Sequence, residues 1–354
     1  MEELIVPLLD LNDHDRVQEY EDFVQNHPQG HLMQSTKWIQ VKEGWDGDYV
    51  YLTDDQDRIK ACLSILSVKN DGEHAFLYAP RGPVCDFHDT DLVTDLIKEA
   101  QVVADKHKAF LLRMDPETLH DPDLVEKYRD LGYTFRSAEQ EDEHVFSNPR
   151  FHMMTDLRGH DEESLLMAFT SNNRRKIRKT YKNNLQTHYL TVDDEGYDQA
   201  LDDFYELTQI MAERQGITHR PKDYFDRLMH SFEDAKLFQT YHEDDLLATC
   251  ILVSYNKKSF YMYAASSNKK RNLNGSLQEN YEAMKYALAR GSEEYDMGGV
   301  FGFDKSDGLY RFKKIFTGHE GLKEFMGELD VVYDQDLYCL LYTSDAADDM
   351  QCVD

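Results

Sequence analysis

The sequence predicts a mixed α/β (α+β) protein made of two domains, each with its own sheet. The chain has 354 residues and a mass of 41.5 kDa, which is enough to bury two separate cores. Short apolar runs such as 109–114 and 246–255 have the length of strands, and longer amphipathic stretches such as 89–107 and 197–215 have the period of helices. Groups of strands followed by helices indicate a mixed architecture in each half.

The first half has the pattern of a helix, a group of strands, and a helix leading to a further strand. Pro80 to Pro83 break the chain between the group of strands and the later helix. The expected elements are a helix at Asp13–Asn26 capped by Asn12 or Asp13, a short helix at Ser35–Glu43, strands at Tyr49–Thr53, Ile59–Ser67 and Ala75–Ala79, a helix at Asp89–His107 and a strand at Ala109–Met114.

The second half starts near Thr155 and has helices on both sides of an antiparallel run of strands. The expected helices are Glu162–Phe169, Asn173–Lys182, Tyr197–Gln215, Lys222–Phe232 and Gln278–Arg290, and the expected strands are His188–Val192, Lys236–Tyr241, Leu246–Tyr255, Ser259–Ala264 and Tyr295–Met297. This order is typical of a GNAT-type acyltransferase domain, and the first half is a shorter variation on it.

The stretch Tyr295–Phe316 is the one around which the rest of the chain is expected to be organised. Its strand is expected to stop at Gly298-Gly299, where the missing Cβ atoms would let a ligand approach the backbone. The following helix should place Leu309, Phe312 and Phe316 on one face and its cations on the others, where they could hold phosphates or an oxyanion. The alternative is an ordinary strand, loop and amphipathic helix with solvated lysines.

Composition excludes several classes of function. The net charge of −29 disfavours a general nucleic-acid binder, although it allows one local basic patch. No apolar run approaches the ~20 residues of a membrane span, and the acidic N-terminus does not resemble a signal peptide, so a cytoplasmic protein is expected. The five cysteines contain no CxxC, and HExxH, Walker A and a properly placed GxGxxG are absent. We therefore expect no metal and no dissociable cofactor.

Several motifs in one order resemble the Fem ligases (FemABX), the non-ribosomal aminoacyl transferases of cell-wall synthesis. They are YAPRGPV (78–84), LLRMDPE (111–117), NNRRKIRK (172–179), GITHRPKDY (216–224), YMYAAS (261–266), YDMGG (295–299) and LYRFKK (309–314). The resemblance covers nearly the whole chain up to about Tyr338. It implies two GNAT-like domains separated by a cleft, formed by residues 1–154 with 325–338 and by residues 155–324.

The resemblance is closest to the compact, FemX-type members, because the region after Asn183 passes directly to HYLTV without a helical-hairpin arm. Such members transfer an amino acid from aminoacyl-tRNA to the lysine side chain of UDP-MurNAc-pentapeptide. Alanine is the expected residue, with serine and glycine left open, and a monomer is expected.

The acceptor brings a diphosphate, which requires cations and hydrogen-bond donors. The resemblance assigns Lys42, Thr218, Arg220, Tyr224 and Tyr263 to this role. Without it, Lys42 would be interpreted as a solvated lysine, and the two tyrosines as core aromatics. Arg220 is better supported by its own context, since it precedes Pro221 and a guanidinium suits phosphate oxygens.

The reaction is the attack of an amine on an ester, which needs a proton acceptor and an oxyanion stabiliser. The resemblance assigns these roles to Asp115 and to Lys313 beside Phe312; for Asp115 the alternative is a cap or turn aspartate. The basic run Arg174, Arg175, Lys176, Arg178 and Lys179 is a candidate for tRNA contact, and its alternative is a solvated helix face.

Two other functions stay open. A CoA-dependent GNAT acyltransferase would need an Arg/Gln-x-x-Gly-x-Gly/Ala turn, and the nearest candidate, 270–275, lacks that spacing. A non-catalytic module that binds tRNA or a cell-wall nucleotide is disfavoured by the presence of both Asp115 and Lys313.

The end of the chain, 339–354, is expected to be non-native. Residues 339–348 read CLLYTSDAAD, which is similar to one reading frame of a transposon-end adapter used in short-read sequencing. The alternative is a genuine acidic tail.

Overall fold

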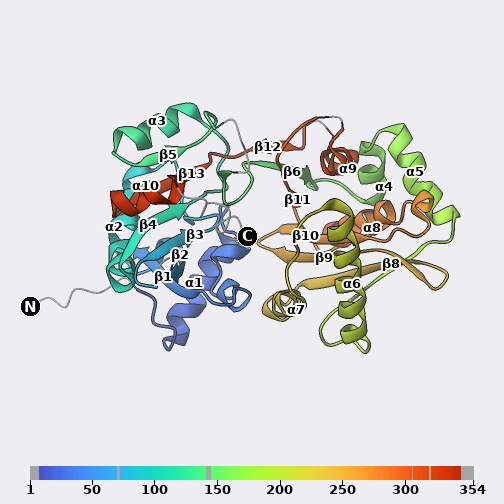
Figure 1. Cartoon of the computed structure of the whole chain (residues 1–354), viewed down its shortest axis with the longest axis horizontal. Helices are drawn as coiled ribbons and strands as arrows, with labels where there is room; N and C mark the ends of the chain where they lie inside the picture. Colours follow the sequence, from blue (N-terminus) through green and yellow to red (C-terminus); the bar gives the residue numbers. More distant parts are fainter. Residues whose placement is uncertain (1–7, 70–71, 141–144, 305, 319, 344–354) are drawn as a thin grey trace, which may run out of the picture. The chain divides into compact units, whose positions relative to one another are not determined.

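The chain forms two compact units, each built around its own sheet (Figure 1). The structure, a computed structural model, describes residues 8–69, 72–140, 145–304, 306–318 and 320–343. The first unit contains residues 1–151 and 324–354, and the second contains residues 152–323. The expected boundaries fell after residues 154 and 324. Within the described ranges, no helix is both long and apolar enough to cross a bilayer.

The first unit contains a six-stranded sheet in the order β1-β2-β3-β4-β13-β5. Strands β3 and β4 pair in parallel, and the other neighbouring strands pair antiparallel. Its strands are β1 (Asp46–Thr53), β2 (Ile59–Lys69), β3 (Ala75–Ala79), β4 (Ala109–Met114), β5 (Thr134–Arg136) and β13 (Glu328–Val332), and its helices are α1 (His14–Asn26), α2 (Thr90–His107), α3 (Pro122–Asp130) and α10 (Gln335–Thr343).

Helix α2 packs on this sheet, and its contacts explain why the amphipathic pattern of 89–107 predicts a helix. The Asp89 side chain accepts a hydrogen bond from the Leu92 amide at 3.0 Å and caps the first turn. The helix buries Val93, Leu96, Ile97 and Ala100 at helical spacing against β1, β2 and β4. The expected helix at 89–107 is therefore confirmed.

The C-terminal strand β13 is held in the first unit by a buried ion cluster. Asp330 accepts from Arg113 Nε and Nη2, both at 2.8 Å, and Glu328 pairs with Arg136 and with Arg113 Nε. These charged side chains are buried and neutralise one another, so removing one of them would leave its partner as an unpaired buried charge. Tyr338 on α10 adds a hydroxyl donor to Asp330 Oδ2 at 3.0 Å.

The expected non-native tail overlaps the end of α10, which the structure extends through Thr343. Residues 344–354 of that expected tail lie outside the described residues.

The second unit contains a seven-stranded sheet in the order β12-β6-β11-β10-β9-β8-β7. Its strands are β6 (Phe151–Asp156), β7 (Gln186–Leu190), β8 (Ala235–His242), β9 (Asp245–Tyr255), β10 (Lys258–Ser266), β11 (Glu294–Val300) and β12 (Leu322–Glu324), and its helices are α4 (Glu162–Ala168), α5 (Ser171–Lys182), α6 (Tyr197–Gln215), α7 (Lys222–Ser231), α8 (Gly275–Ala289) and α9 (Gly308–Thr317).

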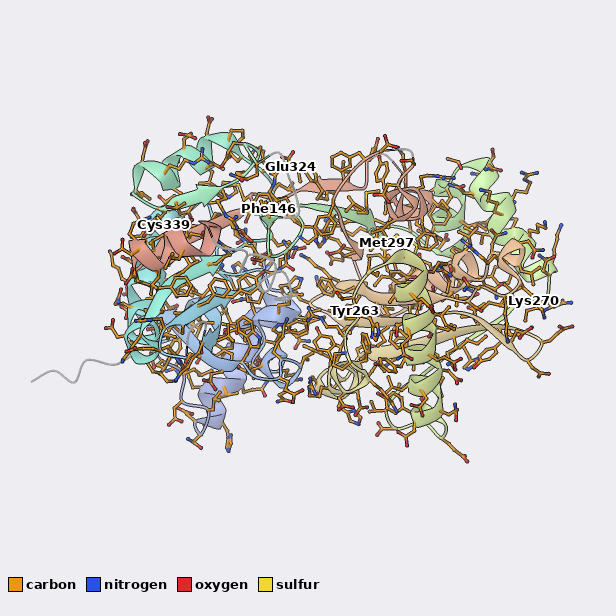
Figure 2. The ribbon with its side chains drawn as sticks, in the orientation of Figure 1. Phe146, Tyr263, Lys270, Met297, Glu324 and Cys339 are labelled. Atoms are coloured by element: carbon orange, nitrogen blue, oxygen red, sulfur yellow. The ribbon has the colours of Figure 1, made fainter. Side chains whose placement is uncertain are left out.

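Strands β7 to β10 form an antiparallel meander, and β11 then pairs with β10 in parallel. The parallel register joins Lys258–Phe260 to Glu294–Asp296, and β10 has an irregularity between Tyr261 and Tyr263. Helices α6 and α8 both pack on the meander. Figure 2 labels Tyr263 and Met297, which lie on β10 and β11.

Two local expectations were wrong. The residues expected to form one short helix, Ser35–Glu43, instead hold only a 3-10 turn at Trp38–Gln40, preceded by another at Leu32–Gln34. Strand β11 does not stop at Gly298-Gly299 but continues to Val300, with Gly298 at φ 78°. A glycine tolerates this backbone within a strand, whereas a side chain would be strained there.

Candidate active site

Helix α9 presents a different face to the core from the one its hydrophobic pattern predicts. It buries Tyr310, Lys313 and Phe316, whereas Leu309 is 49% exposed. The predicted apolar face of Leu309, Phe312 and Phe316 is therefore wrong in part. Lys313 can take a core position because its long apolar stem packs inside and its ammonium group meets backbone oxygen at the end.

The Lys313 ammonium lies against the diglycine of β11. Nζ donates to the Gly299 carbonyl oxygen at 2.7 Å, and a Cβ atom added to Gly298 would lie 3.5 Å from Nζ. Burial lowers the pKa of Lys313 to about 8, while the carboxylates of Asp296 and Asp307 act in the opposite direction. A buried cation beside a side-chain-free stretch of backbone suits the stabilisation of a developing negative charge.

Asp296 holds the backbone of β11 at the diglycine Gly298-Gly299. Its Oδ1 accepts from the Gly298 amide at 2.7 Å, and its Oδ2 lies 2.9 Å from His152 Nδ1. Asp296 is buried, so these contacts are made away from solvent. Neither Asp296 nor His152 was singled out from the sequence, although Asp296 stands inside the YDMGG motif.

Phe312, the neighbour of Lys313, is half-buried and its ring centroid lies 5.6 Å from that of Phe316. It packs along α9 and contributes to the aromatic contact that fixes the helix.

Three of the expected acceptor-binding residues lie together in the second unit. The Tyr263 hydroxyl donates to the Tyr224 hydroxyl at 3.0 Å, and the two rings meet edge to face. The Arg220 guanidinium lies 5.4 Å from the centre of the Tyr224 ring. Thr218, in the segment between α6 and α7, is exposed. The arrangement brings a guanidinium close to two phenolic hydroxyls, which are groups that can bond to phosphate oxygens.

In the first unit, Asp115 is buried directly after β4 and accepts several hydrogen bonds. Oδ1 accepts from the Arg81 amide at 2.7 Å, and Oδ2 accepts from Asn148 Nδ2 at 2.7 Å and from the Tyr78 hydroxyl at 3.2 Å. Burial raises the pKa of Asp115, and the Arg81 guanidinium, 3.8 Å away, opposes that rise. A carboxylate with a raised pKa is a suitable proton acceptor at neutral pH.

The partners of Asp115 were not identified as site residues from the sequence. Tyr78 and Arg81 belong to the YAPRGPV motif, which carried the family resemblance, whereas nothing in the sequence pointed to Asn148. Arg81 is held at φ 56° by its amide contact to Asp115, so the carboxylate also fixes this bend of the backbone.

Lys42, also in the first unit, follows the 3-10 turn Trp38–Gln40 and is half-buried. Its Nζ lies 5.7 Å from the centre of the Trp38 ring. The contact directs the cation along an aromatic face instead of leaving it fully solvated.

The basic run forms helix α5, as expected, but its residues divide into two groups. Arg174 Nη1 donates to the Met167 and Phe169 carbonyl oxygens and so caps the end of α4. Arg175, Arg178 and Lys179 are exposed, and Lys176 is half-buried. Arg174 therefore has a structural role, while the other cations are available to a ligand.

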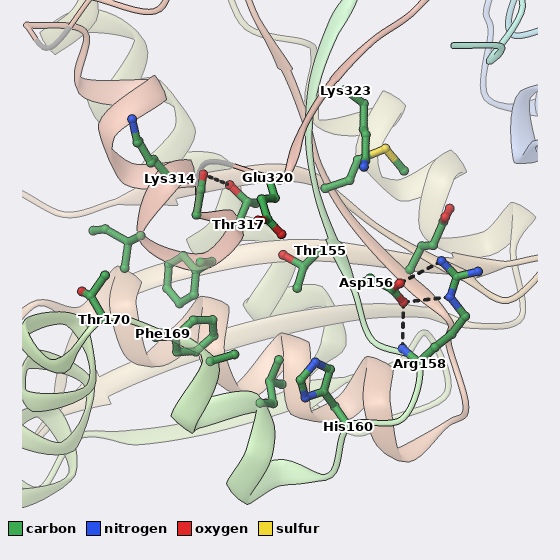
Figure 3. A pocket seen from close by; sticks show the side chains of 18 residues that line it. Thr155, Asp156, Arg158, His160, Phe169, Thr170, Lys314, Thr317, Glu320 and Lys323 are labelled. Atoms are coloured by element: carbon green, nitrogen blue, oxygen red, sulfur yellow. Dashed lines mark hydrogen bonds and ion pairs between the residues drawn. The ribbon is translucent and has the colours of Figure 1, made fainter.

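A cavity of about 640 Å³ lies on the flank of α9 formed by Lys314–Thr317 (Figure 3). Phe169, His160 and Thr155 line it, and Lys323 stands at its upper side in the figure. None of the residues proposed for catalysis or binding from the sequence lines this cavity. In the part of the chain that the structure describes, no group of three or more His, Cys, Asp or Glu side chains could hold a metal ion.

The two units, each with a sheet and packed helices, have the architecture of tandem GNAT-like proteins. A tandem GNAT protein from the clavulanic acid biosynthesis pathway has the same fold, with a TM-score of 0.52 and 13% identity, covering 92% of this chain and 97% of that one. A crystal structure of FemX matches far more closely, with a TM-score of 0.81 and 25% identity over 94% of this chain and 99% of that chain.

The sequence comparisons agree with the structural ones. The chain matches the FemAB family over residues 16–240 and 234–344. It is 34% identical over 341 residues to the UDP-N-acetylmuramoylpentapeptide-lysine N(6)-alanyltransferase of Weissella viridescens, covering 95% of this chain and 99% of that protein. It is 27% identical to the lipid II:glycine glycyltransferase of Staphylococcus haemolyticus, covering 92% of this chain and 93% of that protein. The chain belongs to the FemAB family, whose members named here are aminoacyl transferases.

Proposed function

We propose that this protein transfers an aminoacyl group, alanine in the first instance, from aminoacyl-tRNA to the lysine side chain of UDP-MurNAc-pentapeptide. The observation that carries this proposal is the 34% identity to an enzyme named for that acceptor and for alanine, over 99% of its length. Both proposed substrates are soluble cytoplasmic molecules, so the protein would act in the cytoplasm.

The proposed reaction forms one amide bond and breaks one ester bond. The neutral amine of the acceptor lysine attacks the ester carbonyl and gives up one proton, and the tRNA 3′-terminal ribose oxygen leaves and takes up one proton to become a hydroxyl. An amine with an ordinary pKa of about 10.4 is protonated at neutral pH, so the protein must promote its neutral form. Asp115 would accept the proton, and Lys313 would stabilise the negative charge that develops on oxygen.

The test is a transfer assay with purified protein, alanyl-tRNA and UDP-MurNAc-pentapeptide, followed by mass spectrometry of the acceptor. A gain of one alanine residue on the lysine side chain is expected. Parallel reactions with acetyl-CoA as donor test the CoA-dependent alternative. If neither alanyl-tRNA nor acetyl-CoA gave a product, a non-catalytic binding module would be favoured.

Arg220→Ala is expected to weaken acceptor binding without weakening tRNA binding. Loss of a charge-assisted contact to the diphosphate is worth roughly 1.5–3 kcal/mol, which corresponds to about tenfold or more in affinity. Calorimetry with UDP-MurNAc-pentapeptide measures the effect. Arg227→Ala, on helix α7, which begins two residues after Arg220, is the matched control. Wild-type affinity of the Arg220 variant would remove this residue from the acceptor site.

Asp296→Asn is expected to move the alkaline limb of the pH–rate profile. Lys313 must be protonated to act as a cation, and its pKa of about 8 means that turnover should fall as the pH rises through that value. Asp296 raises this pKa, so neutralising it should shift the limb to lower pH by roughly one unit. Asn can keep the hydrogen bond to the Gly298 amide, and Asp156→Asn, on an exposed pair with Arg158, serves as the control. An unmoved limb would contradict the role of Asp296.

A further inference from the structure

Helix α5 carries an exposed cationic face on a strongly acidic protein. The face consists of Arg175, Arg178, Lys179 and Lys182, and the helix contains no acidic residue. Among the described residues, no carboxylate forms an ion pair with any of these four side chains. A cluster of cations that the protein does not neutralise itself is suited to a polyanionic partner.

Two exposed tyrosines lie beside α8, the helix on which α5 packs. Tyr181 lies in the last turn of α5 and is 39% exposed, and Tyr189 lies on the sheet-edge strand β7 and is 46% exposed. Helix α5 packs along α8, where Lys285 Nζ lies 5.9 Å from the centre of the Tyr181 ring and Glu282 accepts from the Tyr181 hydroxyl. Helix α8 therefore links the cationic helix α5 to the edge strand β7.

A cavity of about 390 Å³ lies between α8 and strands β7 and β8, and Lys285, which contacts Tyr181 of α5, is one of its lining residues. Its aromatic wall is formed by Tyr189, Phe238 and Tyr286, whose ring centroids are 5.1 to 5.9 Å apart. The polar groups that line it include Lys285 and the carboxylates of Glu162 and Glu282. We call this cavity the tyrosine pocket.

We propose that the tyrosine pocket binds one unstacked base of an RNA single strand whose phosphates lie along the cationic face of α5. This inference rests on the proposed use of tRNA and adds to it a site for a base. Every base has an aromatic face that can stack on tyrosine, and cations beside such a platform neutralise the phosphates of the same strand. An apolar lipid or peptide would gain nothing from the unpaired cations of α5.

The carboxylates of the pocket suggest which base it prefers. Carboxylates accept hydrogen bonds from exocyclic amino groups, which cytosine and adenine carry and uracil lacks. Glu282 is held by Lys285 at 2.8 Å and by the Tyr181 hydroxyl, whereas Glu162 lies 4.0 Å from Lys285 Nζ and its side chain is 66% exposed, so Glu162 is the more accessible acceptor. We therefore expect a cytosine or adenine in the pocket to bind more tightly than a uracil.

The experiment uses the full chain and two RNA hairpins of identical stem sequence, one blunt and one with a single-stranded 3′ tail of cytosine and adenine. Affinities are measured by fluorescence anisotropy for the wild type, Tyr189→Ala, Tyr189→Phe and Lys179→Ala. Tyr51→Ala is the matched control, since Tyr51 is a partly exposed tyrosine on β1, the edge strand of the other sheet. A tail containing 2-aminopurine reports stacking directly through quenching of its fluorescence.

Tyr189→Ala should weaken binding of the tailed hairpin by roughly 5- to 100-fold, the effect of losing one base-stacking contact, and should leave the blunt hairpin unchanged. Tyr189→Phe and Tyr51→Ala should bind both hairpins like the wild type. Lys179→Ala should weaken the binding of both hairpins and reduce its salt dependence. The quenching of 2-aminopurine should be lost only in Tyr189→Ala.

If Tyr189→Ala lost affinity equally for both hairpins, or kept its affinity for the tailed hairpin, the proposed base pocket would be overturned. A uracil tail that binds as tightly as the cytosine and adenine tail would overturn the assigned preference. The transfer assay separates this inference from the proposed function: a wild type that binds the tailed hairpin with the expected Tyr189 dependence but transfers no amino acid would refute the function alone. Normal transfer by Tyr189→Ala with unchanged RNA affinity would refute the pocket alone.

Discussion

Replacing Lys313 with methionine is expected to lower turnover by ~10²–10³ while leaving affinity for UDP-MurNAc-pentapeptide within a few-fold. This is the size of effect that follows the loss of one donor to a transition-state oxyanion. The interaction is made mainly in the transition state, so kcat should fall and ground-state binding should not. Steady-state transfer assays with varied acceptor concentration, together with calorimetric affinities, measure the two quantities separately.

The stability of the Lys313→Met protein distinguishes lost chemistry from lost structure. Methionine keeps the unbranched stem and removes a cation whose burial already lowers its pKa, so the melting temperature should not fall. Lys314→Met is the matched control: Lys314 is the next residue on α9, and its Nζ lies over the Tyr310 ring at 4.9 Å. Lys314→Met should retain normal turnover. Near-normal turnover of folded Lys313→Met would make Lys313 a structural residue.

The environment of Lys313 also shows where sequence reasoning reaches its limit. Periodicity predicted α9 as a helix, because a 3.6-residue pattern is a local property of the chain. It placed Lys313 on a polar face, because a lysine is seldom buried. Its burial depends on the Gly299 carbonyl oxygen and the Asp296 carboxylate of β11, contacts across an intervening loop that no local pattern encodes.

The same distinction applies to Asp115. The apolar run 109–114 predicted a buried strand, and a carboxylate at its end followed directly from the sequence. Its partners Arg81 and Asn148 lie 34 and 33 residues away along the chain, so only the fold brings them together. The resemblance to a family identified Asp115 as a candidate, and the structure adds a physical reason for its altered proton affinity.

Asp115→Asn is expected to lower turnover by ~10²–10⁴, the usual contribution of a general base. The substitution keeps the size of the side chain and removes its capacity to accept a proton. Burial raises the pKa of Asp115, so in the wild type turnover should fall on acidification at a pH above that of an ordinary aspartate. In the variant this acidic limb should disappear from the pH–rate profile, while the alkaline limb that we assign to Lys313 should remain.

A loss of stability in Asp115→Asn must be separated from a loss of chemistry. If the Asn oxygen accepts from the Arg81 amide, its amide group faces that of Asn148 and two donors oppose each other, which costs about 1–3 kcal/mol. Asp48→Asn is the matched control, because Asp48 is another buried aspartate of the first unit, held by Lys106 at 2.6 Å and His107 at 2.7 Å. It should lose comparable stability and keep its turnover. Two outcomes would contradict the role of Asp115 as the base: a parallel loss of stability and turnover in both variants, or an acidic limb that persists in Asp115→Asn. In either case Asp115 would serve to hold the bend at Arg81, and another group would accept the proton.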